Sequence, residues 1–161
     1  MVDLTNQFIL NNQSLFMLKV RQLLSGKNID TIYTVRSDQT VIEALELMAA
    51  KNIGAVMVVD DDRLVGIFSE RDYARKGIIQ GRKAKSTPIS EVMTSGVYTV
   101  DPTQTIEDCM EMMSAKRIRH LPVMEGDRVV GLVSISDIVT AIIREQAHRI
   151  QNLESYISGS Y

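Results

Sequence analysis

The 161-residue sequence contains one cysteine, no tryptophan and only three prolines, and aromatic residues make up 5% of it. The single cysteine, Cys109, excludes an internal disulfide and a cysteine-rich metal site, and it favours a reducing compartment. The apolar stretches Phe8 to Leu10 and Leu15 to Leu24 are too short and too often interrupted by polar residues to cross a membrane. Since the N-terminus also carries no recognisable export signal, we expect a cytoplasmic protein with no membrane partner.

The sequence also lacks an excess of charge of either sign. Eighteen Lys and Arg balance twenty Asp and Glu, which gives a formal charge of -2. Such a balance provides no overall field to hold a polyanion, so we expect no nucleic-acid partner. With 45% hydrophobic and 24% charged residues, the composition is that of a soluble globular protein, and the length allows a core without disulfides.

An internal repeat organises the chain. Residues 33–72 align with residues 98–137 at an offset of 65 without a gap, and 17 of the 40 aligned positions are identical. Most of the other pairs exchange one apolar residue for another, as two copies of one core require. Two copies are too few for a solenoid, so the sequence predicts a closed pair of homologous lobes.

Apolar periodicity and turn residues predict the same order of elements in each copy. A short β-rich segment comes first, a helix with apolar residues at i, i+3, i+4 and i+7 follows, and two strands and a second helix complete the copy. The expected elements are strands at 32–35, 55–59 and 64–68 with helices from Val41 and over about 70–79, and strands at 97–100, 121–124 and 129–133 with helices from Ile106 and over about 136–143. Each copy is therefore a β-α-β-β-α unit.

Five segments are expected along the chain. Residues 1–16 have no counterpart and form an N-terminal arm, 17–79 form the first repeat, and 80–88 form a linker rich in Gly, Lys, Ser and Pro. Residues 89–145 form the second repeat. In 146–161, isoleucines recur at heptad spacing, which predicts an amphipathic helix that packs on another subunit or back on the chain.

The segments Gly66 to Asp72 and Gly131 to Asp137 resemble the Gly-h-x-[Ser/Thr]-x-x-Asp signature of cystathionine-β-synthase (CBS) domains. The resemblance covers about residues 18–145 and includes Arg117 to Val123. It implies an α/β (α+β) fold in which two β-α-β-β-α CBS repeats pack as a pseudo-two-fold pair, usually called a Bateman module. It further implies that adenine nucleotides bind in clefts between the repeats and that the module dimerises.

The residue types of the signature suit such a ligand. A hydroxyl at the end of a strand and an aspartate three residues later place both groups over a helix N-terminus, where anions are favoured. Asp72 and Asp137 can accept hydrogen bonds from ribose hydroxyls, at about 1.5–3 kcal/mol each because the acceptor is charged. Ser69 and Ser134 can face a phosphate.

Further positions are expected to complete the two sites. Strand edges would supply an apolar slot for the base, and nearby cations would balance phosphate charge. The base-contacting candidates are Thr34, Ile53, Ala55, Thr99, Ile118 and Pro122, and the cationic candidates are Arg71, Arg119 and His120. Because the second copy has Ser136 where the first has Arg71, the two sites should be unequal, one preferring AMP and the other a larger ligand such as ATP or NAD.

Two functions fit these observations. The favoured one is a non-catalytic regulatory module that requires no cofactor and couples nucleotide level to an unknown effector protein. The alternative is a structural homodimer in which Ser69, Asp72 and their counterparts only cap helices. No nucleophile with its base, metal-ligand cluster or Gly-rich phosphate loop is recognisable, so neither catalytic nor metal-binding residues are predicted. Cys109 is expected to be inert core.

Overall fold

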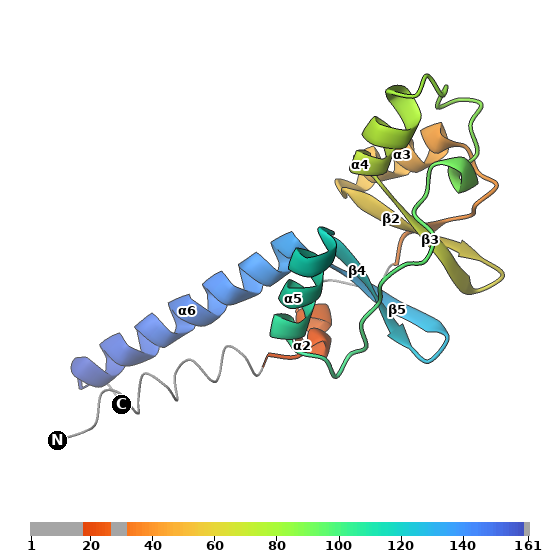
Figure 1. Ribbon diagram of the computed structural model, residues 1–161. Coiled ribbons are helices and arrows are strands. Elements are labelled where there is room, and N and C mark those ends of the chain that lie inside the picture. The colour runs from red at the N-terminus through yellow and green to blue at the C-terminus, as the bar shows by residue number, and fades with distance from the viewer. Residues whose placement is uncertain (1–17, 27–31, 160–161) are drawn as a thin grey trace. The chain divides into compact units, whose positions relative to one another are not determined.

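The computed structural model describes residues 18–26 and 32–159 (Figure 1). The arm expected at residues 1–16 lies outside them. The described residues fall into two compact units. Unit 1 contains residues 18–26, 101–121 and 133–159, and unit 2 contains residues 32–100 and 122–132. Of the described helices, none is both long and apolar enough to cross a membrane.

Unit 2 holds most of the first repeat, and it is built on a three-stranded sheet of order β1-β2-β3. The elements are β1 (Thr34–Val35), α3 (Val41–Lys51), β2 (Ala55–Asp60), β3 (Arg63–Ser69), α4 (Glu70–Asp72), the π-helical segment η1 (Tyr73–Ile78) and the 3-10 segment η2 (Ile89–Glu91). β1 runs parallel to β2, and β2 runs antiparallel to β3. The apolar stripe of α3 packs with the strands and with Ile89 and Val92 into one core.

Unit 1 is mainly helical and holds the helices of the second repeat. Its helices are α2 (Val20–Ser25), α5 (Ile106–Lys116) and α6 (Ile135–Ile157), and both α2 and α5 contact α6. The strands β4 (His120–Glu125) and β5 (Arg128–Ser134) form the second sheet, most of which belongs to unit 2, and α6 follows β5 directly. Ile106, Cys109 and Met113 of α5 are buried, as the predicted stripe requires, and so is Ile138 of α6.

The β-α-β-β-α order is confirmed in the first repeat, while in the second repeat the first strand is reduced to a single bridge. Of 97–100, only Val100 pairs, through a parallel bridge to Val123. Val100 donates to the Pro122 carbonyl at 3.0 Å and accepts from Met124. Proline has no N–H, so Pro122 cannot donate a backbone hydrogen bond to the first strand of its repeat. Its counterpart Met57 has an N–H and pairs with Thr34.

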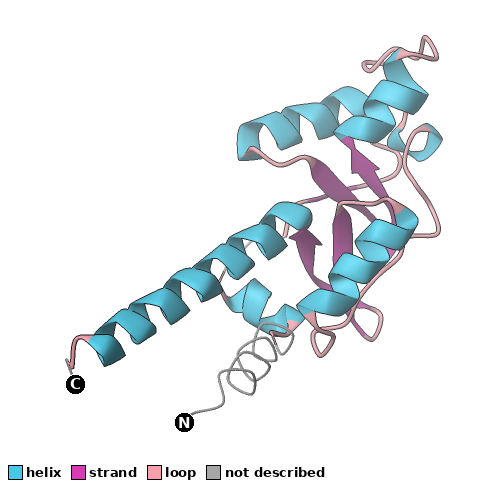
Figure 2. Cartoon of the chain, turned by 60° about the vertical axis from the view of Figure 1, so that its left-hand side comes forward, coloured by secondary structure: helices cyan, strands magenta, loops and turns pink. Residues whose placement is uncertain are grey.

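The closing helices also differ from the prediction. The first, expected as one helix over about 70–79, is a three-residue α-helix continued by η1. The second, expected to end near Ile143, is a single 23-residue helix that runs to Ile157 (Figure 2). The segment expected as a separate tail is therefore mostly the second half of α6, because no Gly or Pro interrupts 135–157.

The segment that precedes each repeat docks onto the helix of the other repeat. Before repeat 1, the Leu18 carbonyl accepts from Ile106 N at 2.9 Å, and Val20 N donates to the Gln104 carbonyl at 2.8 Å. Before repeat 2, the Thr87 carbonyl accepts from Val41 N at 2.9 Å. The two segments thus play equivalent parts. Segment 18–25 supplies buried residues to unit 1, beside α5 of repeat 2, and segment 87–92 supplies buried residues to unit 2, beside α3 of repeat 1.

Candidate functional site

The first glycine of the signature, Gly66, allows the chain after η2 to approach β3. A Cβ at Gly66 would lie 2.6 Å from Met93 Sδ and 3.1 Å from the Thr94 carbonyl oxygen. Two backbone hydrogen bonds of 2.8 and 2.9 Å join Thr94 to Ile67 in this approach. The absence of a side chain at Gly66 therefore lets Thr94 lie against β3, close to the end of the strand at Ser69, where the candidate site begins.

At the end of β3, Ser69 and Asp72 form a reciprocal capping box. Asp72 N donates to Ser69 Oγ at 3.2 Å, while Asp72 Oδ2 accepts from Ser69 N at 2.9 Å and from Ser69 Oγ at 3.0 Å. Such a box satisfies backbone donors that have no partner in the first turn of a helix. Ser69 and Asp72 therefore cap this helix, as the structural alternative expected, and their contact with a ligand stays a prediction.

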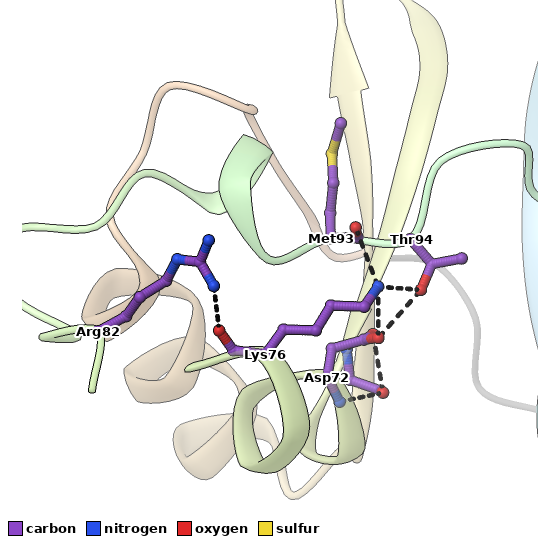
Figure 3. A network of polar contacts seen from close by, with 6 residues as sticks. Asp72, Lys76, Arg82, Met93 and Thr94 are labelled. Atoms are coloured by element: carbon purple, nitrogen blue, oxygen red, sulfur yellow. Dashed lines mark hydrogen bonds and ion pairs between the residues drawn. The ribbon is translucent and has the colours of Figure 1, made fainter. Parts of the chain in front are cut away.

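The other oxygen of Asp72 is held by two further side chains (Figure 3). Asp72 Oδ1 accepts from Thr94 Oγ1 at 2.9 Å and forms an ion pair with Lys76 Nζ at 3.5 Å. The Asp72 side chain is 13% exposed. Its carboxylate is consequently part of a closed polar network within unit 2.

At the end of β5, Ser134 and Asp137 repeat the box, with Asp137 Oδ2 accepting from Ser134 N at 2.8 Å. Here the aspartate borders a cavity of about 490 Å³ within unit 1. Residues within and beside α2, the first residue of α5 and one face of α6 line this cavity. They are Leu18, Gln22, Leu23, Gly26, Ile106, Asp137, Thr140, Ala141, Arg144, Glu145 and His148.

This cavity, hereafter the Asp137 cavity, has one apolar wall and one polar wall. Leu18, Leu23 and Ile106 supply apolar surface. Along α6 the polar groups run from Asp137 to Arg144 and His148, which are seven and eleven residues further on. At 1.5 Å per residue, this strip is about 16 Å long. Asp137 stands at one end, and two nitrogen-bearing side chains, with Glu145 between them, stand toward the other, which suits a molecule with hydroxyls at one end and anionic groups at the other.

The structure brings some of the predicted site residues next to the capping boxes. Ala55 pairs with Ser69 across β2 and β3. The Arg119 carbonyl accepts from Ile135 N at 2.9 Å, beside the second box, and the Gly54 carbonyl accepts from Glu70 N at the equivalent place. These contacts lie within single units and obey the 65-residue offset.

The predicted residues differ in their surroundings and in how exposed they are. Thr34 pairs with Met57, two residues along β2 from Ala55, and Ile53 packs against the unit 2 core. Arg71 and Arg119 are exposed, and Ile118, His120 and Thr99 are half-buried, while Pro122 is buried in β4. Their roles in binding stay predictions.

Sequence reasoning missed four residues that surround the two aspartates: Lys76, Thr94, Thr140 and Arg144. Three of them could have been found from helical spacing, since residues three, four or seven positions after a helix N-terminal aspartate lie on its face. Thr94 could not, because only the close approach at Gly66 brings it to Asp72.

Two negative expectations concern metal and thiol chemistry. Among residues 18–26 and 32–159, no group of three or more His, Cys, Asp or Glu side chains is placed to hold a metal ion. Cys109 is fully buried, and burial raises the pKa of its thiol to about 11, with the neighbouring Asp108 charge adding to the effect. A thiol with so high a pKa forms little of the reactive thiolate at neutral pH.

Comparison with known proteins identifies relatives over most of the chain. The family model for the CBS domain matches residues 27–77 and 89–144. A mitochondrial CBS domain-containing protein of Arabidopsis thaliana, CBSX3, is 41% identical over 142 residues, which cover 84% of this chain and 69% of that protein.

Solved structures show the same architecture. A CBS-domain protein from Burkholderia ambifaria is 46% identical, with a TM-score of 0.77 over 80% of this chain and 96% of that one. Another CBS domain pair, 30% identical with a TM-score of 0.69 over 78% of this chain and 96% of that one, was solved in complex with 5'-methylthioadenosine and S-adenosyl-L-methionine.

Proposed function

Because the chain belongs to the CBS domain family and contains two CBS repeats, we propose that it is a regulatory module that binds an adenine nucleotide. The ligand is AMP, ATP or NAD, and the module acts without catalysis and without a required cofactor. Support comes from the related domain pair solved with two adenosine-containing ligands.

The observation that carries this proposal is the Asp137 cavity. Its volume, about 490 Å³, lies within the range typical of small-molecule sites. In the proposed complex, Asp137 accepts hydrogen bonds from the ribose hydroxyls, the wall of Leu18, Leu23 and Ile106 contacts the base, and Arg144 faces phosphate. Arginine is suited to that role because its guanidinium group can donate two parallel hydrogen bonds to phosphate.

Calorimetric titration with AMP, ADP, ATP, NAD, NADH and S-adenosylmethionine tests the proposal. We expect at least one of them to bind, and Asp137→Asn to abolish that binding. Asp127→Asn, which removes the same charge from an exposed turn, is the matched control and should bind as the parent does. Absence of binding by all six compounds would contradict the proposal.

The non-catalytic part of the proposal has its own test. Prolonged incubation with ATP or NAD, followed by chromatography, should return each compound unchanged. A product that forms with the parent protein and not with Asp137→Asn would show an enzyme instead.

Regulation follows if the ligand stabilises one conformation of the module and an effector protein prefers that conformation. The effector is then coupled to nucleotide level through differential affinity alone. The proposed setting is the cytoplasm, where adenine nucleotides are abundant and a free buried thiol such as Cys109 is stable.

One observation favours the alternative function, a structural dimer with vestigial sites. The carboxylate of Asp72 is fully engaged by its own chain, as a purely structural helix cap would be. The titration above separates the two functions, because a scaffold would bind none of the six compounds while keeping its oligomeric state.

In either case we propose that the chain forms a homodimer through α6. Val139, Ile143, Ile150, Leu153 and Ile157 are each at least 48% exposed, and they recur at alternating intervals of three and four once Gln146 is included. Isoleucine at the a positions with leucine at d favours a parallel two-stranded coiled coil. In that register Arg149 stands at g and Glu154 at e, so the chains would form attractive pairs across the interface.

Light scattering coupled to gel filtration measures this directly. We expect a dimer for the parent and a monomer for Ile150→Asp, while Gln151→Asp on the neighbouring face of α6 should remain dimeric. A dimer that persists in Ile150→Asp would show that another surface pairs the chains, and a chain that lacks residues 1–17 tests whether that segment covers the stripe instead.

A further inference from the structure

We propose that Lys76 and Thr94 close the ligand site of the first repeat, so that each chain binds its nucleotide at Asp137 and not at Asp72. This inference rests on the proposed function and adds which of the duplicated sites is used. It is carried by the polar network around Asp72 (Figure 3).

The first step concerns the capacity of the Asp72 carboxylate. An ionised carboxylate has about four acceptor positions. Ser69 N and Ser69 Oγ lie at 2.9 and 3.0 Å from Oδ2, and Thr94 Oγ1 and Lys76 Nζ lie at 2.9 and 3.5 Å from Oδ1. Two ribose hydroxyls could be accepted only after some of these donors leave.

The donors are fixed in place by contacts at both ends of Lys76. Its ammonium group also lies 3.4 Å from the Met93 carbonyl oxygen and 3.3 Å from Thr94 Oγ1. Its own carbonyl accepts from Arg82 at 2.6 Å. Two backbone hydrogen bonds between Thr94 and Ile67 hold the Thr94 backbone beside β3, so its hydroxyl can leave Asp72 only by rotation of the side chain.

The second repeat lacks the central member of this network. The 65-residue offset places Ala141 at the position of Lys76. An alanine cannot form an ion pair with Asp137, and its short side chain lines the Asp137 cavity instead of filling it. One substitution between the repeats therefore removes the ammonium group that pairs with the aspartate in repeat 1, and in repeat 2 the aspartate borders a cavity.

The experiment opens the first site by removing the ammonium group. Lys76→Met keeps most of the aliphatic stem, and Lys85→Met removes the same charge from an exposed position of the linker. Titration with AMP, ATP and NAD, each separately, should give one ligand per chain for the parent and for Lys85→Met. Lys76→Met should give two, and adding Asp72→Asn to it should restore one.

The reciprocal change installs the cation in the second repeat. Ala141→Lys should weaken binding at least tenfold, because its ammonium group competes for Asp137 and its stem fills the cavity. Ala147→Lys adds the same charge at an exposed position outside the cavity and should bind as the parent does. Equal binding by the two lysine variants would contradict the inference.

The outcomes separate this inference from the proposed function. Two ligands per chain in the parent, or an unchanged single ligand in Lys76→Met, overturn the closed site while leaving nucleotide binding intact. If none of the probes binds any variant, the proposed function fails, and a double-mutant cycle of Asp72→Asn with Lys76→Met then decides on the closure. We expect a coupling of about two- to fivefold in the unfolding constant, and a coupling of one would overturn it.

Discussion

The two closing helices begin with the same capping box and then diverge. After Ser134 and Asp137, α6 continues as a regular α-helix for 23 residues. After Ser69 and Asp72, the chain makes a single α-helical turn, changes to the π-helical segment η1 and leaves the helix after Ile78. The residues that the two repeats share thus form the same first helical turn, while the residues that follow this turn determine what surrounds the aspartate.

The divergence has a local cause in the residues of the next turn. Tyr73 and Gly77 replace Ile138 and Ile142 of α6. A Cβ at Gly77 would lie 2.9 Å from Tyr73 Cδ2, so the tyrosine ring lies where the side chain of residue 77 would stand. A wider π-helical turn accommodates this ring, and such turns are often found at functional sites.

The largest difference between the repeats is expected in ligand affinity. Asp137→Asn should weaken nucleotide binding by about 100-fold or more, since two charge-assisted hydrogen bonds of about 1.5–3 kcal/mol each are lost or weakened. Asp72→Asn should leave the affinity within about twofold. Calorimetric titration of both variants checks this, and similar losses in the two variants would mean that the repeats are equivalent.

A smaller effect is expected on stability from Gly77→Ala. Helix propensity alone would make this change stabilising by up to about 1 kcal/mol. The contact with the Tyr73 ring predicts the opposite sign, a loss of about 1–2 kcal/mol, because a methyl group added to a filled site forces neighbours apart. Urea unfolding of the variant measures the sign, and a more stable Gly77→Ala would show that the ring moves aside freely.

The capping serines allow a comparison at the point where the repeats agree. Ser69→Ala and Ser134→Ala should each destabilise the protein by about 1 kcal/mol, since each removes a side-chain acceptor from a helix N-terminus. Ser90→Ala, at an exposed position, is the control. Thermal unfolding compares the three variants, and a cost confined to one repeat would show that only one box stabilises the fold.

The smallest effect concerns the turns before α3 and α5. Arg36 pairs with Asp38 at 3.0 Å in the first turn. In the second turn, hydrogen bonds from the Thr103 side chain and backbone lower the pKa of Asp101 from its usual 3.8. A carboxyl group with a lowered folded-state pKa contributes stability above its unfolded pKa and loses it as the pH falls through the folded value.

Asp101→Asn should therefore slightly lower the melting temperature at pH 7 and have no effect near pH 2. Melting curves of the parent and the variant across this range measure the difference. A gap that is constant with pH would assign the effect to the shape of the turn rather than to its charge.

The repeat made much of this architecture predictable from sequence. The helices begin at Val41 and Ile106, as the periodicity predicted, and both signatures form the helix caps that the structural alternative expected. These features depend on residues within four positions of one another, which a sequence displays directly.

The features that escaped prediction depend on long-range contacts. The linear repeats did not reveal that 18–25 docks beside α5, nor that Thr94 reaches Asp72 across the approach at Gly66. The first strand of the second repeat is lost before Val100 because Pro122 occupies the position of Met57. This loss could have been predicted only if the pairing partner of that strand had been known.

Segments 18–25 and 87–92, each of which docks beside the helix of the other repeat, also affect how the chain folds during synthesis. Residues 32–100 supply most of unit 2, which residues 122–132 complete, so the greater part of that lobe has been synthesised once Val100 leaves the ribosome. Segment 18–25 emerges much earlier, yet its hydrogen-bonding partners at Gln104 and Ile106 are made only afterwards. The apolar face of segment 18–25 therefore stays exposed to solvent until residues 104–106 have been synthesised. Chaperones bind nascent chains during intervals of this kind.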